Sequence, residues 1–144
     1  LILGKWSDKK VREAFLTQIL EEVPDFHERR RHIWSYFGLR YFEMEKDGSF
    51  VIDRSQYHVA TAYWLTAEKQ PSTYYKKWKR EIEKEGGSIV IQLTDGISPF
   101  GYQYNPEYFV ITSWESKAAF NNFKEKLKAS ELDNIQHVNE FILN

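Results

Sequence analysis

Residues 56–144 predict an α+β domain whose elements follow the order βαββαβ. Four short segments rich in β-branched and aromatic residues are typical of strands, and two longer amphipathic segments between them are typical of helices. The chain has 144 residues, of which 42% are hydrophobic and 17% aromatic, so it is long enough to bury one sizeable core. We therefore predict one main domain, residues 56–144, that carries an N-terminal extension, residues 1–55.

The sequence of the N-terminal extension predicts helices followed by a β-hairpin. Apolar residues recur at helical spacing after an expected N-cap at Ser7 and stop at Pro24, which interrupts a helix but can open the next one. From Gly38 onward the apolar residues alternate, and residues 46–49 have the composition of a turn. We expect a hairpin that extends to residue 52.

The first strand of the main domain is expected at Tyr57–Leu65, and both of its faces are largely apolar. Because side chains alternate along a strand, one face carries Tyr57, Val59, Thr61, Tyr63 and Leu65, and the other carries His58, Ala60, Ala62 and Trp64. We expect the first set to lie away from the helices, where a second copy of the chain would cover it. The second set is then expected to face the helices.

The remaining elements follow in order along the chain. A helix opens at Pro71 and ends at Gly86 and Gly87, two strands follow at residues 88–93 and 108–113, Ser116 caps a second helix, and the last strand is Ile135–Leu143. The caps and the closing glycines are typical helix boundaries. This order is that of the ferredoxin-like fold, with an antiparallel sheet in which strands one and four are neighbours.

Charge and cysteine content exclude several classes of protein. Twenty basic and 21 acidic side chains give a net charge of -1, which disfavours nucleic acid as a partner. The chain has no cysteine, so it has neither disulfides nor Cys-ligated metal, which favours a reducing compartment such as the cytoplasm. No stretch is long enough to span a membrane as a helix, and we expect no membrane partner. The first residue is Leu rather than Met, which leaves open a removed targeting segment.

The third strand and the helix after it carry a family resemblance. Residues 110–123, VITSWESKAAFNNF, resemble the strand-to-helix junction of antibiotic-biosynthesis-type monooxygenases and IsdG-type heme-degrading enzymes. Residues 62–87 also resemble the first βα unit of NIPSNAP-like proteins. The resemblance implies the dimeric α/β-barrel superfamily, hence a homodimer, and suggests oxygenation as a reaction.

The residues that perform heme cleavage in the IsdG-type branch have no counterpart in this chain. That branch uses an Asn on strand one, a Trp on the second helix and a His further along this helix. On a gap-free alignment these positions fall near Ala62, at Phe123 and at or near Asp133. We therefore expect no heme cleavage and no cofactor.

Seven residues form the predicted site. His58 is the candidate catalytic acid or base, because a neutral-range pKa suits imidazole for that role, although a strand histidine is more often packed and hydrogen-bonded. The expected ligand-binding residues are Ala60, Ala62, Trp64, Trp114, Phe123 and His137. The two alanines would leave a pocket between sheet and helices, and His58 and His137 could approach each other across strands one and four. No metal is expected, because no typical ligand spacing is present.

Two functions from different classes remain open. In the first, the chain binds a small apolar or aromatic ligand, with cofactor-independent monooxygenation as a possible reaction. In the second, it is a non-catalytic structural or assembly protein that contacts partners through its barrel fold and extension. The aromatic loop at residues 94–106 could cover a ligand or pack on a partner subunit. The three arginines at residues 29–31 are either a solvated helix face or an anion site.

Overall fold

The computed structural model describes residues 5–26, 28, 49–65, 71–94, 106–130 and 135–143. The chain divides into two compact units, residues 1–37 and 38–144. The predicted second helix beyond residue 28, the first strand and most of the turn of the predicted hairpin, the three arginines and nearly all of the aromatic loop lie outside the described residues, and these predictions stay untested. Residues 50–52, the predicted second strand of the hairpin, are described and form no strand, so this part of the hairpin prediction is wrong.

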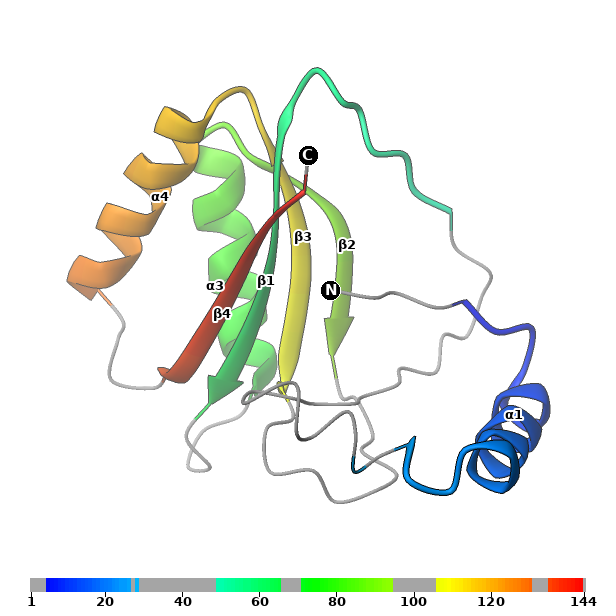
Figure 1. Cartoon of the computed structure of the whole chain (residues 1–144). Coiled ribbons are helices and arrows are strands. Elements are labelled where there is room, and N and C mark those ends of the chain that lie inside the picture. Colours follow the sequence, from blue (N-terminus) through cyan, green and yellow to red (C-terminus); the bar gives the residue numbers. More distant parts are fainter. Residues whose placement is uncertain are drawn as a thin grey trace. The chain divides into compact units, whose positions relative to one another are not determined.

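The first unit contains helix α1, Lys9–Glu22 (Figure 1). Its N-cap is Asp8 rather than the predicted Ser7, because the Asp8 carboxylate accepts a hydrogen bond of 2.9 Å from the backbone N–H of Val11 and so satisfies one of the free donors of the first turn. The Val23 N–H donates to the Ile19 carbonyl at 2.9 Å, and Pro24 follows. The prediction of a helix ending before Pro24 is confirmed.

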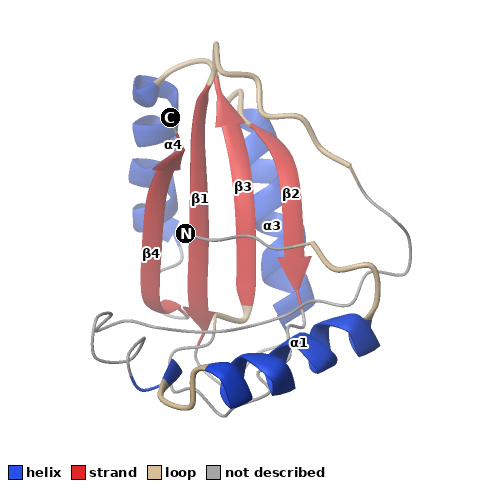
Figure 2. Ribbon diagram, turned by 45° about the vertical axis from the view of Figure 1, so that its right-hand side comes forward, coloured by secondary structure: helices blue, strands red, loops and turns tan. Residues whose placement is uncertain are grey.

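The second unit contains a four-stranded antiparallel sheet in the order β2-β3-β1-β4. Its elements are β1 (Tyr57–Leu65), α3 (Pro71–Lys84), β2 (Ser88–Thr94), β3 (Tyr108–Trp114), α4 (Lys117–Ser130) and β4 (Ile135–Leu143). Figure 2 shows α3 and α4 together behind one face of the sheet. The predicted α+β class and antiparallel sheet are confirmed, and strands one and four are neighbours as expected.

The helices pack on the face of β1 that was expected to lie away from them. Val59 belongs to a buried cluster with side chains of both helices, and Tyr63 belongs to a second cluster with α3. We call this the aromatic face. The opposite face, called here the alanine face, carries His58, Ala60, Ala62 and Trp64 with their cross-strand neighbours. Our assignment of the two faces was wrong, because both are apolar and the alternation alone does not distinguish them.

The junctions of α3 and α4 fix how the helices lie on the sheet. At the end of α3, Gly86 has φ 79°, and the Gly86 and Gly87 N–H groups donate to the carbonyls of Glu83 and Ile82, the pattern of a Schellman motif. At the start of α4, the Ser116 hydroxyl accepts from the Ala119 N–H at 3.2 Å. Both predicted helix boundaries are confirmed.

Candidate functional site

The seven predicted site residues lie on two opposite faces of the sheet. Trp114 and Phe123 belong to the aromatic face. The alanine face carries Ala60, Ala62 and Trp64, together with His58 on the same side of β1, and His137, which lies opposite Trp64 in the β1–β4 register. A single pocket lined by all seven residues is therefore excluded, because the sheet itself separates the two groups.

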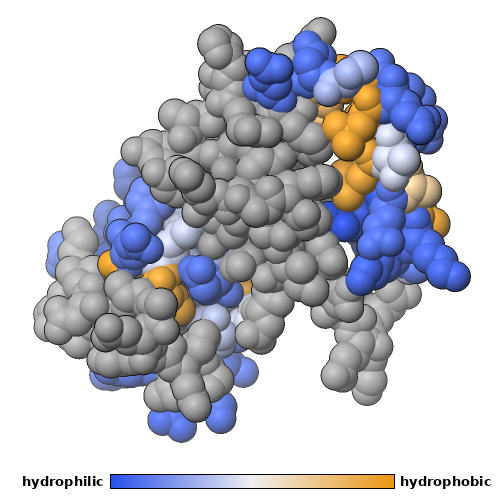
Figure 3. Space-filling view, turned by 90° about the horizontal axis from the view of Figure 1, so that it is seen from below, coloured by the Kyte–Doolittle hydropathy of each residue, from blue (hydrophilic) through white to orange (hydrophobic). Residues whose placement is uncertain are grey.

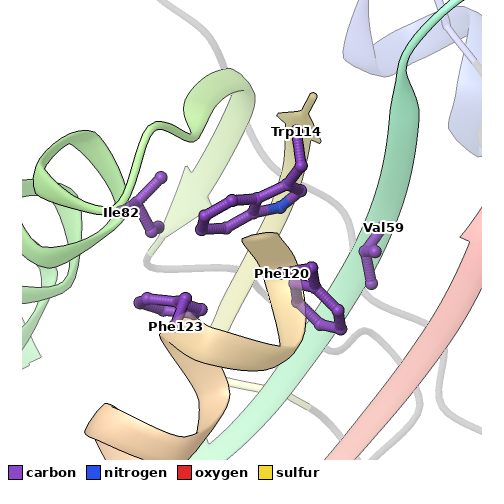
Figure 4. Close-up of a cluster of buried hydrophobic side chains, with 5 residues drawn as sticks. All are labelled: Val59, Ile82, Trp114, Phe120 and Phe123. Atoms are coloured by element: carbon purple, nitrogen blue, oxygen red, sulfur yellow. The ribbon is translucent and has the colours of Figure 1, made fainter. Parts of the chain in front are cut away.

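Side chains fill the aromatic face around Trp114. This indole is fully buried, and its ring centroid lies 5.1 Å from that of Phe123 and 5.6 Å from that of Phe120. In Figure 4 the Trp114 ring points between Ile82 on α3 and the two phenylalanines on α4. Its Nε1 donates to the Thr112 hydroxyl at 2.7 Å. The predicted pocket between sheet and helices is thus occupied by core side chains at this position.

The rest of the aromatic face is a stack of tyrosine and tryptophan rings. Tyr63 stacks on Trp78 with centroids 4.5 Å apart, and Tyr108 stacks on Tyr75 at 4.5 Å and on Trp78 at 5.0 Å. Burial raises the pKa of Tyr63 and of Tyr108 well above the ordinary value for tyrosine, because the phenolate is disfavoured away from water. These hydroxyls therefore stay protonated, and this cluster is a core without acid–base chemistry near neutral pH.

On the alanine face, the two smallest side chains of β1 lie between larger ones. Ala60 is paired with Ile111 on β3 and Phe141 on β4, and Ala62 is paired in the same way with the two residues Phe109 and Asn139. Side chains stand roughly perpendicular to a sheet, so the methyl groups of the alanines end below their neighbours. We call Ala60 and Ala62 the alanine row.

One end of the alanine row is formed by Trp64 and His137. Their ring centroids lie 4.9 Å apart and the rings are tilted by 58°. Trp64 is 8% exposed, and its buried Nε1 has no hydrogen-bond partner among the described residues. A buried indole N–H normally has an acceptor, so this end offers one donor for a further group.

His58 forms the other end and is 1% exposed. Its Nδ1 lies 3.2 Å from the Gln56 carbonyl oxygen. Directly across the β1–β3 ladder is Ser113, whose hydroxyl donates to the side-chain oxygen of Gln56. Neither Ser113 nor Gln56 is among the predicted site residues, because their approach to His58 depends on the strand register, which no local pattern specifies.

The expected approach of His58 to His137 is wrong. In the ladder His58 lies opposite Leu143, whereas His137 lies opposite Trp64. The two positions, 58 and 64 on β1, are six residues apart, which corresponds to roughly 20 Å along an extended strand. The two strands are neighbours, but the imidazoles lie at opposite ends of the alanine row.

Across the described ranges of the chain, no group of three or more His, Asp or Glu side chains is close enough to hold a metal ion. No helix in the described segments combines the length and apolar character needed to cross a membrane.

Next to His58, the pKa of Asp53 is lowered mainly by hydrogen bonds from the Ser55 hydroxyl and N–H.

Comparison with known proteins adds no assignment, since no family model and no curated protein sequence matches the chain.

Proposed function

We propose that the chain binds a small apolar or aromatic molecule on the alanine face of the sheet. The observation that carries this proposal is the alanine row: two methyl groups between larger side chains on both neighbouring strands. Because Ala60 and Ala62 are 0% and 5% exposed, a flat apolar body over the row would be enclosed rather than lie on an open surface, in contact with the walls formed by Phe109, Ile111 and Phe141. Such a site, mostly apolar with a few polar groups at its ends, has the usual composition of a small-molecule site.

The polar ends support a ligand that carries hydrogen-bonding groups. Trp64 Nε1 is buried and can donate to an acceptor, and His58 is the titratable side chain at the other end. Of the seven predicted residues, the proposal retains His58, Ala60, Ala62, Trp64 and His137. Trp114 and Phe123 are assigned to the core.

We also propose membership of the ferredoxin-like fold and the dimeric α/β-barrel superfamily. Two observations support it: the strand order β2-β3-β1-β4 with both helices on one face, and the resemblance of residues 110–123. The superfamily suggests oxygenation of the bound molecule without a cofactor. Consumption of dissolved oxygen on addition of a bound aromatic compound would test that reaction.

The binding proposal is tested by placing a larger side chain in the alanine row. N-phenyl-1-naphthylamine, a neutral fluorescent probe, is titrated into the wild-type chain and into Ala62→Leu. We expect saturable binding to the wild type and at least tenfold weaker binding to the variant, because the larger side chain occupies the ligand volume.

Ala118→Leu is the matched control, since Ala118 is exposed on α4. This variant should bind the probe like the wild type. Circular dichroism and urea unfolding show whether Ala62→Leu is folded. Unchanged probe affinity in a folded Ala62→Leu chain would refute a site above the alanine row.

Exposed apolar side chains favour the second candidate function, assembly with protein partners. Phe141 and Ile142 at the end of β4 are 38% and 53% exposed, and Val51, before β1, is 84% exposed. In Figure 3 apolar residues likewise form small patches among the hydrophilic ones. These side chains could contact a second copy of the chain, as in the expected homodimer.

Sedimentation velocity tests this assembly candidate. A two-chain species at micromolar concentration that Ile142→Lys converts to a single chain would support it. A single chain for the wild type across that concentration range would contradict the homodimer.

A further inference from the structure

The hydrogen bond at His58 determines which of its ring nitrogens carries the proton. A backbone carbonyl only accepts hydrogen bonds, so the 3.2 Å contact between His58 Nδ1 and the Gln56 oxygen requires the proton on Nδ1. In a neutral imidazole the other nitrogen, Nε2, is then an acceptor with a free lone pair.

The surroundings of His58 hold the ring in this orientation. Gln56, which supplies the carbonyl, is itself fixed through its side chain by the Ser113 hydroxyl, and Ser113 is the cross-strand neighbour of His58. The two ring nitrogens point in diverging directions. With Nδ1 directed at Gln56, Nε2 points away from it, and among the described residues no donor reaches Nε2.

We infer that the ligand carries an O–H or N–H donor that bonds to Nε2 of His58. The inference rests on the proposed binding site above the alanine row, and it specifies the chemical class of the ligand: an apolar or aromatic body with a neutral hydrogen-bond donor. The tautomer with its proton on Nδ1 offers only an acceptor at Nε2, so it selects a ligand that supplies the donor. Ser113 and Gln56 are positioning residues in this arrangement.

The protonation state is measured first, on the full-length chain. Two-dimensional ¹⁵N NMR at pH 8, where imidazole rings are neutral, distinguishes a protonated nitrogen from an unprotonated one. We expect His58 with a protonated Nδ1 and an unprotonated Nε2. A protonated Nε2 would overturn the inference, whatever the ligand-binding results.

The ligand class is measured with a matched pair of probes, indole and 1-methylindole, by calorimetry at pH 8. They differ in that the second lacks the N–H donor. We expect indole to bind roughly five- to tenfold more tightly, the usual effect of one hydrogen bond, and His58→Phe to abolish this preference. Should His58→Phe fail to fold, Ser113→Ala provides the second variant, in which the preference should decrease because Gln56 loses its anchor.

The two proposals fail in different ways. Equal affinity for indole and 1-methylindole, both sensitive to Ala62→Leu, would overturn the donor inference and leave the binding site in place. Absence of binding for both probes and for N-phenyl-1-naphthylamine would overturn the proposed function itself.

Discussion

At the scale of single residues, the close approach of Gly87 to Trp114 is the tightest constraint on the aromatic face. A Cβ atom at Gly87 would lie 2.7 Å from two ring carbons of Trp114 and 2.9 Å from a methyl carbon of Ile82. Both neighbours are buried, so neither can move away freely. We expect Gly87→Ala to lower the free energy of unfolding by about 1–3 kcal/mol, the usual cost of overpacking, as measured by urea unfolding.

Gly86 is the matched control, because glycine is favoured there by the backbone conformation and not by a close neighbour. A Cβ there would meet no atom within 4 Å, but φ is 79°, a conformation that costs most other residues about 1–2 kcal/mol. Gly86→Asn should therefore be tolerated better than Gly86→Ala, since Asn accepts this backbone conformation. If Gly87→Asn lowered the free energy of unfolding no more than Gly86→Asn does, this would contradict the close approach of Gly87 to Trp114.

Thr112 gives a second residue-scale prediction. Its hydroxyl accepts from Trp114 Nε1 at 2.7 Å, and both side chains are buried. Thr112→Val keeps the shape but leaves the indole N–H without its acceptor, which should cost about 1–3 kcal/mol of unfolding free energy. Thr112→Ser retains the hydroxyl and should keep the indole hydrogen bond. A Trp fluorescence spectrum unchanged in Thr112→Val would argue against this bond.

At this scale the sequence predicts which residues share a face, but not what lies on that face. The alternation along β1 correctly grouped His58 with Ala60, Ala62 and Trp64. It did not place them relative to the helices, because the odd-numbered residues are apolar as well. The contact between Ser113 and Gln56 brings together residues 57 positions apart, and no local pattern contains that information.

At the scale of elements, the Ser116 cap at the start of α4 can be tested directly. Its hydroxyl satisfies the Ala119 N–H, one of the free donors of the first turn. Ser116→Ala should lower the unfolding free energy by about 1 kcal/mol, within the range of N-cap substitutions, whereas Ser116→Asn should change it little. Equal stabilities for the alanine and asparagine variants would show that the side chain does not act as the cap.

The boundaries of the elements were well predicted where a turn or cap residue marks them. β1 and β4 begin and end at the predicted residues, and α3 begins at Pro71. The cap of α1 was misplaced by one residue, because Ser7 and Asp8 are both good N-caps and only the side-chain hydrogen bond to Val11 distinguishes them. Propensity therefore locates an element better than its exact terminal residue.

The packing of α4 also bears on heme chemistry. Phe123 is 3% exposed and contacts Trp114, so its position in the helix is part of the core. We expect that heme added with a reductant in air keeps its Soret band and yields no open-chain product. Conversion to such a product, abolished by substitution of His58 or His137, would contradict this prediction and would identify a different heme site.

At the scale of the whole molecule, the α+β class and the order of elements followed from the sequence alone. The reason is that the helices of the second unit have residues that mark their boundaries: Pro71 and Gly86 for α3, and Ser116 for α4. The sequence does not show which face of the sheet the helices cover, because both faces of β1 are apolar. Ala60 and Ile111 on the alanine face are 0% and 1% exposed in a single chain, so the expected uncovered sheet face is not a reason for dimerisation.

The buried tyrosines predict how the stability of the molecule depends on alkaline pH. Tyr63 and Tyr108 have pKa values raised by burial, whereas in the unfolded chain tyrosine ionises near pH 10. Above about pH 10 the unfolded chain therefore loses protons that the folded chain retains. The stabilisation is fully present below that pH and decreases as the pH rises further, by up to about 1.4 kcal/mol per pH unit for each residue.

Urea unfolding at pH 8, 10.5 and 11 measures this dependence. The double variant Tyr63→Phe/Tyr108→Phe should show a shallower loss, because phenylalanine has no proton to release, and this comparison removes the contribution of lysine deprotonation. In parallel, tyrosinate absorbance at 295 nm should show part of the nine tyrosines ionising only as the chain unfolds. If all nine ionised together near pH 10 while circular dichroism still reported the folded state, the two buried hydroxyls would have to be accessible to water.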